Sequence, residues 1–193
     1  MSKLREDRRV TQTRRVLKCS LLKLLMEKPI QRITVTDVCR RADVNRGTFY
    51  AHYLNPEDLL SQIQESLKLC LLQIFETDRL ENILPALSET LRAEADFCRA
   101  QLSGHMDRSF LQEITGLIQD KVIAKWQRRY PHVSQTRLEM LFSFCFHGYI
   151  ALLQEWLDGT KGQSGDRLED VAKQLVAACV VHIATETAVH QGN

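Results

Sequence analysis

The chain has 193 residues, 44% of them apolar, which is enough for one compact unit or two small ones with a real core. Residues 1–56 hold 13 Lys/Arg against 5 Asp/Glu, net +8, whereas residues 57–193 hold 13 against 19, net −6. The charged start, residues 1–9, lacks the apolar stretch of a secretory signal, and the longest nearly apolar run, residues 175–184, is too short for a membrane span. We therefore expect a cytoplasmic protein with a small head that binds a polyanion and an acidic body.

The first predicted helix runs from about Arg9 to Glu27 and ends at Lys28–Pro29. Its apolar stripe at helical spacing consists of Val16, Leu17, Leu21, Leu24 and Leu25. Near its start, four arginines are placed to approach a phosphate backbone: Arg8, Arg9, Arg14 and Arg15. Any single one of them can equally be a solvated surface residue.

Three helix starts follow in close succession between residues 33 and 59. Each begins with a residue type that caps the free amides of a first turn, namely Thr34, Asn45 and Asn55. Asp37 and Asp58 stand three residues after two of these caps and complete a capping-box pattern. Apolar pairs that fit a hydrophobic staple flank all three caps: Ile33 with Val38, Val44 with Phe49, and Leu54 with Leu59. With the tight turn at residues 42–44 and Pro56 at a first helical position, this spacing predicts a helix-turn-helix followed by a third helix.

Helical patterns continue through the rest of the chain. The helix from Pro56 is expected to run past Phe75, and residues 80–102 are helical in pattern, with Pro85 as a break or a fresh first turn. After a loop at residues 103–105, Asp107 is expected to cap a helix over residues 108–129 that stops at Tyr130–Pro131. Ser134 is expected to cap a helix that runs to Asp158 and stops at Gly159. Asp166, together with Glu169, is expected to cap the last helix.

The last two helices carry the widest apolar faces. The first face consists of Leu138, Leu141, Phe142, Cys145, Phe146, Tyr149, Ile150, Leu153 and Trp156, and the second of Leu168, Val171, Leu175, Val176, Ala178, Cys179 and Ile183. Such faces imply a deep core, an interface with a second copy, or both on different sides of each helix. We expect an all-α fold: a three-helix DNA-binding domain at residues 1–56, linked by the long fourth helix to a helical-bundle domain for dimerisation and ligand binding at residues 57–193.

Chemistry-bearing patterns are weak. The six cysteines are scattered, without a CxxC pair or Cys/His ligand spacing, which favours buried structural thiols over metal or redox roles. Cys145 and His147 are close in sequence but point to different sides of a helix. No Gly-rich phosphate loop, zinc pattern or pair of catalytic carboxylates is visible. We expect no enzymatic activity, metal or cofactor.

The run ITVTDVCRRADVNRGTFYAHYLNPEDLL at residues 33–60 resembles the DNA-binding head of TetR-family transcriptional regulators of bacteria. The likeness spans residues 9–60 and is most specific at NRGTFYAHY, residues 45–53, where the family has Gly-Thr-hydrophobic-Tyr-x-His-aromatic. FHGY at residues 146–149 and LQEWL at residues 153–157 are similar to one C-terminal subgroup of the family. The resemblance implies an all-helical homodimer with a ligand-sensing body.

Roles in DNA binding can be assigned on this basis. Arg46, Gly47 and Thr48 lie in the first turn of the recognition helix, where Arg46 can bind guanine, Thr48 can hydrogen bond or touch a thymine methyl group, and Gly47 allows close approach. Tyr50 and His52 are expected to donate to phosphates, as are Thr34 and Thr36 at a positive helix end. Phe49 and Tyr53 are expected to hold the helix in place. The full set expected at the DNA is Arg14, Thr34, Thr36, Asn45, Arg46, Gly47, Thr48, Tyr50 and His52.

Two residues depart from the family pattern. Asp43 stands where the family usually has Gly, which suggests a left-handed residue that Asp tolerates less well, or a slightly different turn. Pro56 stands where the family often has a phosphate-contacting Lys, so we expect a weaker clamp there.

The body is less informative than the head. Candidates for an effector pocket are Phe97, Met106, Phe110, Trp126, Phe144 and His147, although such residues at helical spacing are more often plain core. Candidates for the dimer interface are Phe142, Phe146, Tyr149, Leu153, Trp156, Leu175, Ala178 and Cys179. We expect a homodimeric repressor that binds a palindromic double-stranded DNA operator and responds to a small-molecule effector of unknown identity. An architectural nucleoid-binding protein without effector control is the alternative.

Overall fold

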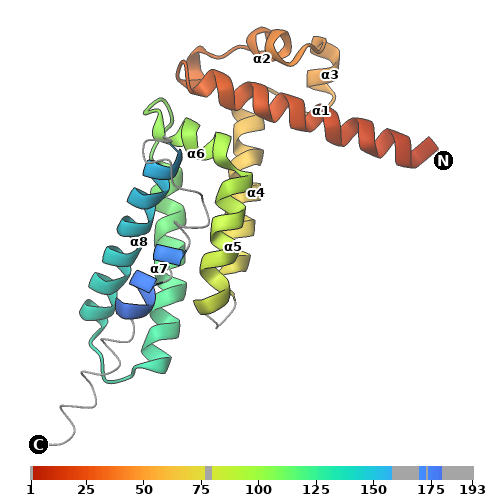
Figure 1. Cartoon of the computed structure of the whole chain (residues 1–193). Helices are drawn as coiled ribbons and strands as arrows, with labels where there is room; N and C mark the ends of the chain where they lie inside the picture. The colour runs from red at the N-terminus through yellow and green to blue at the C-terminus, as the bar shows by residue number, and fades with distance from the viewer. Residues whose placement is uncertain (1, 77–79, 158–169, 173, 180–193) are drawn as a thin grey trace, which may run out of the picture. The chain divides into compact units, whose positions relative to one another are not determined.

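A computed structural model of the chain describes the backbone of residues 2–76, 80–157, 170–172 and 174–179, and their side chains except those of residues 2–7 and 80–82. These residues form helices joined by turns, with no strand among them, which confirms the predicted all-α class (Figure 1). The chain divides into two compact units. The head unit comprises Met1–Leu69 with Glu94–Phe110, and the body unit comprises Cys70–Ala93 with Leu111–Asn193. A domain boundary at residue 56 stays a prediction.

The first helix, α1, spans Ser2–Leu25. It begins at Ser2 instead of Arg9, because no Pro or Gly interrupts the residues between them. The predicted apolar stripe packs in the head unit, where Leu17, Leu21 and Leu25 are fully buried. A turn and a short 3-10 helix, η1 at Ile30–Arg32, lead from α1 into the next helix.

The two short helices of the head unit are α2, Val35–Ala42, and α3, Arg46–Tyr50. Thr34 and Asn45 cap them through their side chains, which confirms both predicted caps. Between the helices Asp43 adopts the left-handed conformation, with φ 52° and ψ 47°, as its place in the turn suggested. Ile33, Val38 and Phe49 are buried, so the apolar residues that flank the caps fix α2 and α3 in the head unit.

The long helix α4 spans Pro56–Ile74 and buries Leu59, Ile63, Leu67 and Leu71. Its cap is as predicted, since Asn55 Oδ1 accepts a hydrogen bond from the Asp58 amide at 2.7 Å. The third staple prediction is wrong, because Leu54 is 79% exposed. The reason is local: the Asp58 carboxylate accepts from the Leu54 amide at 2.9 Å, one residue before the expected position, and the Leu54 side chain stays in solvent.

Residues 80–102 form two helices, α5 at Leu80–Ala93 and α6 at Ala95–Leu102. Pro85 was expected to break the helix or start a new one, and this is wrong: it lies inside α5. The proline removes one intrahelical hydrogen bond, and α5 continues through it. The interruption falls at Glu94, with φ −102° and ψ 25°. Its carboxylate pairs with Lys18 of α1 at 2.5 Å, which ties α6 to α1 within the head unit.

The body unit contains most of α7, Ser109–Arg129, and all of α8, Gln135–Leu157. α7 stops at Tyr130–Pro131 and Ser134 caps α8, as predicted. A buried hydrogen bond of 3.0 Å joins Ser88 Oγ of α5 to the Tyr149 hydroxyl of α8. Residues 170–172 and 174–179 are also helical. The predicted stop at Gly159, the cap of Asp166 with Glu169, and the face residues Leu168 and Ile183 lie outside the described residues.

All six cysteines are free. Cys39 and Cys98 are buried, as expected of structural thiols, whereas Cys70 is exposed. Burial raises the pKa of the Cys98 thiol to about 11, and the neighbouring Glu94 carboxylate acts in the same direction. Burial, with contact to the Cys179 thiol, raises the pKa of Cys145 to about 12. These protonated thiols fit packing roles.

Candidate nucleic-acid interface

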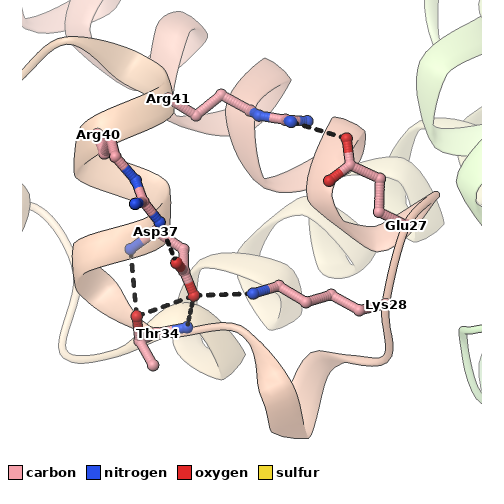
Figure 2. Close-up of polar contacts among 6 residues, drawn as sticks. All are labelled: Glu27, Lys28, Thr34, Asp37, Arg40 and Arg41. Carbon is pink, nitrogen blue, oxygen red and sulfur yellow. Dashed lines mark hydrogen bonds and ion pairs between the residues drawn. The ribbon is translucent and has the colours of Figure 1, made fainter.

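The first turn of α2 is closed by a network around Asp37 (Figure 2). The Thr34 hydroxyl accepts from the Asp37 amide at 3.1 Å, and the Thr34 amide donates to the Asp37 carboxylate at 3.1 Å, which completes the predicted capping box. Lys28 Nζ and Arg40 Nη2 also donate to this carboxylate, at 2.9 and 2.7 Å. The hydrogen bond from Lys28, followed by those from the Thr34 amide and hydroxyl, holds the pKa of Asp37 well below its usual range.

This network limits what Thr34 can offer to a phosphate. Its amide and its hydroxyl proton are both donated to Asp37, the hydroxyl at 3.0 Å, so no donor of Thr34 is left over. Thr36, two residues on, is exposed and makes no hydrogen bond with another described side chain. At the start of α2, Thr36 is therefore the better donor for a phosphate, and Thr34 acts as the cap.

The first turn of α3 is built differently. Asn45 Oδ1 accepts from the Thr48 amide at 2.8 Å and from the Thr48 hydroxyl at 3.1 Å. A Cβ at Gly47 would lie 3.2 Å from Asn45 Oδ1, so the absence of a side chain at residue 47 leaves room for the cap. Gly47 thus serves the internal geometry of α3 as well as its predicted close approach to DNA.

Around this cap the structure brings the central predicted contacts together in the head unit. Arg46 is exposed, and its guanidinium makes no hydrogen bond or ion pair with a described residue. Asn45 and Gly47 are exposed, and Thr48 is half-buried. Arg46 and Thr48 are thus side chains of one helix start, and among the described residues no carboxylate forms an ion pair with Arg46.

The other end of α3 holds the aromatic residues. Phe49 is fully buried and Tyr53 nearly so, and their rings lie 5.9 Å apart, which fits their predicted packing role. Tyr50 is 55% exposed and His52 is half-buried, with its ring 6.2 Å from that of Tyr53. Burial raises the pKa of the Tyr53 hydroxyl, and the positive charge of the exposed Arg14 on α1 opposes that change.

Sequence reasoning missed the ion pairs that hold the turn after α1 against α2. Besides Lys28 with Asp37, Arg41 pairs with Glu27 at 2.7 Å (Figure 2). The partners stand 9 and 14 residues apart, one in the turn after α1 and the other on α2, so no helical spacing marks them. Arg40, whose side chain is 77% exposed, was missed as a basic residue beside Thr36.

The six candidates for an effector pocket are divided between the two units. Phe97, Met106 and Phe110 are buried in the head unit, and the rings of Phe97 and Phe110 pack edge to face at 5.6 Å. Trp126 is buried in the body unit, whereas Phe144 is 71% exposed and His147 is exposed, with Nδ1 bonded to the Ser143 carbonyl at 2.8 Å. The buried members behave as core residues, and a ligand-binding role stays a prediction.

α8 has two apolar faces on opposite sides. One, at residues 138, 142, 149 and 153, is buried, and includes Phe142, Tyr149 and Leu153, which were expected at the dimer interface. The other is exposed and contains Met140, Phe144, His147, Gly148 and Ala151, which lie within one arc because a helix turns about 100° per residue. The sequence pattern identified the first face and missed the second.

Of the remaining interface candidates, Phe146, Trp156 and Cys179 are partly buried, and Leu175 and Ala178 are exposed. Val171, Leu175 and Ala178 share one exposed side of the last described helix, while Ala172 is buried on the other. Contact between the Cys145 and Cys179 thiols places this helix beside α8. The exposed sides of α8 and the last described helix therefore carry the most exposed large apolar residues of the described body unit, which are Phe144, Met140 and Leu175.

Among the described residues, no helix is long and apolar enough to cross a membrane. In the same part of the chain, His, Cys, Asp and Glu side chains do not gather in groups of three or more that could hold a metal ion.

Two protein-family models match this chain, each over a different part of it. The family model for bacterial regulatory proteins of the tetR family matches residues 21–63, and the model for the transcriptional regulator C-terminal region matches residues 78–183. A curated relative, the uncharacterized HTH-type transcriptional regulator YxbF of Bacillus subtilis, is 45% identical over 62 residues. That segment is 31% of this chain and 16% of the relative, so the chain matches only a small part of that protein.

Solved structures extend the likeness to the whole fold. The dihydroxyacetone kinase operon activator DhaS has a TM-score of 0.59 at 22% identity, over 90% of this chain and 97% of that one. The fatty acid degradation regulator FadR from Bacillus halodurans has a TM-score of 0.64 at 15% identity, over 85% and 94%. A TerR/AcrR-family regulator from Aquifex aeolicus has a TM-score of 0.64 at 19% identity, over 86% and 98%. With the capped helix-turn-helix and the match over residues 78–183, which is more than half of the sequence, the chain belongs to the TetR family of DNA-binding transcriptional regulators.

Proposed function

We propose that this regulator is a repressor that binds a palindromic operator as a homodimer. The observation that carries the proposal is the start of α3, where the exposed Arg46 guanidinium is free of described partners beside Asn45 and Thr48. A guanidinium without an internal partner can bind guanine O6 and N7 in the major groove in bidentate fashion. The alternative, an architectural protein without effector control, needs no such reading group.

Contacts to phosphates are proposed to fix the position of α3 along the DNA duplex. Thr36, Tyr50, His52 and Arg14 are exposed or half-buried in the head unit, around the side chains expected to read bases. They donate to phosphate oxygens and fix orientation without carrying sequence information. Thr34 supports them indirectly, because it caps α2 and keeps Thr36 at the first turn.

The homodimer is supported by the second face of α8. Met140 is 69% and Phe144 71% exposed, and Leu175 of the neighbouring helix is 54% exposed. Large apolar side chains that are exposed to water are unfavourable and indicate an interface when several lie on one face, as Met140 and Phe144 do on α8. A second copy with the same face fits a two-fold symmetric dimer, which in turn fits a palindromic operator.

Repression needs only that the bound dimer occludes a promoter, and we assign effector control of DNA affinity to the body unit. A helix-turn-helix regulator acts where the chromosome lies, so we place the protein in the cytoplasm. DhaS, with the same fold, is named an activator, so the sign of regulation has to be measured. Transcription from a promoter that carries the selected operator should fall when the protein is added. A rise would make the protein an activator.

Selection from a random pool of duplex DNA by the purified full chain tests the proposal most directly. We expect one enriched inverted repeat with a guanine in each half-site that depends on Arg46. Binding to all sequences with equal affinity would favour the architectural alternative. No binding at any salt concentration would exclude both.

The dimer is tested by Phe144→Glu, with Gln112→Glu as the matched control. Both add one negative charge at an exposed position of the body unit, but only Phe144 lies on the second face of α8. Light scattering at micromolar concentration should show a dimer for the wild type and for the control, and a monomer for Phe144→Glu. A dimeric Phe144→Glu variant would place the interface elsewhere.

A further inference from the structure

Two hydrogen bonds in the first turn of α3 determine where the protons of Asn45 and Thr48 lie. The Thr48 amide can only donate, and it lies 2.8 Å from one atom of the Asn45 carboxamide. That atom must therefore be the oxygen, Oδ1, which fixes the orientation of the carboxamide. Nδ2 is then the other atom, and it makes no hydrogen bond with any described residue.

The same oxygen decides the role of the Thr48 hydroxyl. Oγ1 of Thr48 lies 3.1 Å from Asn45 Oδ1, and a carboxamide oxygen can only accept. The single hydroxyl proton of Thr48 is therefore donated inward to Asn45. Only the lone pairs of Oγ1 and the methyl group remain for a ligand outside.

We propose that Thr48 reads a base amino group, N6 of adenine or N4 of cytosine, as a hydrogen-bond acceptor, while Asn45 Nδ2 donates to an acceptor of the DNA. In the major groove only adenine and cytosine present a donor to such an acceptor, whereas guanine and thymine present oxygen atoms. At one position of each half-site, A or C on one strand is therefore preferred over G or T. This inference rests on the proposed operator binding and adds the polarity of the contact.

Gly47 is part of this arrangement. Any Cβ at residue 47 would lie 3.2 Å from Asn45 Oδ1, closer than ordinary van der Waals contact. A side chain there would push the oxygen that holds both the Thr48 amide and the Thr48 hydroxyl. The role of the Thr48 hydroxyl as an acceptor thus depends on the lack of a side chain at Gly47.

The test removes single amino groups from the DNA. In an operator selected with the wild type, each adenine is replaced by purine and each cytosine by 2-pyrimidinone, which lack only the amino group. Affinities are measured for the wild type, Thr48→Val and Thr48→Ser. Valine keeps the shape but has no acceptor, and serine keeps the hydroxyl but has no methyl group. Both retain the backbone amide that Asn45 caps, so the first turn of α3 is preserved.

We expect one replacement per half-site that weakens wild-type binding about three- to tenfold, the loss of one hydrogen bond. The same replacement should weaken Thr48→Ser similarly and leave Thr48→Val unaffected. Because a missing amino group also alters base pairing, only the difference between variants counts. Equal losses for the wild type and Thr48→Val at every position would overturn the inference, although specific binding still held. A wild type that enriches no operator would instead overturn the proposed function.

Discussion

The first turns of α2 and α3 use the same capping chemistry with opposite consequences. At α2 the residue three places after the cap is Asp37. Its carboxylate accepts hydrogen bonds from the amide and hydroxyl of Thr34 and forms ion pairs with Lys28 and Arg40. At α3 the corresponding residue is Thr48, which returns no bond to the backbone of the cap and leaves Arg46 without a described partner. One helix start is closed upon itself and holds the head unit together. The other leaves the Arg46 guanidinium and Asn45 Nδ2 without a described partner.

The largest expected effect concerns the apolar residues that flank the caps. Ile33 is 4% exposed, so Ile33→Ala should destabilise the head unit by about 2–5 kcal/mol through a cavity. Leu54 occupies the same position before the cap of α4 but is 79% exposed, and Leu54→Ala should change stability by less than about 0.5 kcal/mol. Thermal unfolding, with hydrogen exchange of the α2 and α3 amides, measures both. Similar losses in the two variants would mean that Leu54 is buried in solution.

The next effect separates reading from holding at α3. Arg46→Ala should remove about 1–3 kcal/mol of discrimination at one guanine and flatten the sequence preference. His52→Ala should weaken binding to all sequences by a similar factor, because a phosphate contact carries no sequence information. Affinities for the selected operator and for single-base variants, at one fixed salt concentration, distinguish the two. A uniform loss for both variants would remove the base-reading role of Arg46.

At α2 the closed cap makes a pH-dependent prediction. Asp37→Asn should lower stability at pH 7 by about 1–2 kcal/mol, because the cap weakens and the pairing with Lys28 and Arg40 is lost. The pKa of Asp37 is lower in the folded state, so its contribution is fully present above the unfolded pKa of about 3.9 and is lost progressively as the pH falls from there through the folded-state pKa. Urea unfolding from pH 7 to pH 3 should show a constant difference in the free energy of unfolding above about pH 4 and a shrinking difference below it. A difference in the free energy of unfolding that stays constant over this pH range would show that the charge of Asp37 is not what stabilises the cap.

The sequence was most informative where the determining contacts lie within four residues, although the exposed Leu54 is a local exception. Caps at Thr34, Asn45 and Asn55, the left-handed Asp43 and the stop at Tyr130 all depend on local backbone groups, which the neighbouring residues specify. Pro85 was misjudged because a proline usually breaks or begins a helix, whereas α5 continues through it.

The missed features depend on which surfaces meet. Lys28 with Asp37 and Lys18 with Glu94 join elements that are distant in sequence, so their spacing carries no signal. On α8, periodicity grouped Phe142, Tyr149 and Leu153 correctly on one face. Periodicity could not show whether the chain itself or a second copy covers that face. It also did not show that Met140 and Phe144 lie on a second, exposed face of α8. Covering a face is a property of the packed unit, which the sequence period of one helix does not contain.

The smallest stability effect gives the sharpest contrast between the two caps. Asn45→Ala removes the acceptor of the Thr48 amide and should lower stability by about 1 kcal/mol, whereas Asn45→Asp keeps a capping oxygen and should retain that stability. The two variants also differ in DNA preference, because in Asn45→Ala the Thr48 hydroxyl proton loses its internal acceptor and becomes able to donate to guanine or thymine. Asn45→Asp should bind every sequence more weakly, since its charge repels phosphates, but should keep the preference for A or C. Selection from a pool randomised at one half-site measures this. An unchanged preference in Asn45→Ala would show that the open cap of α3 does not set the polarity of Thr48.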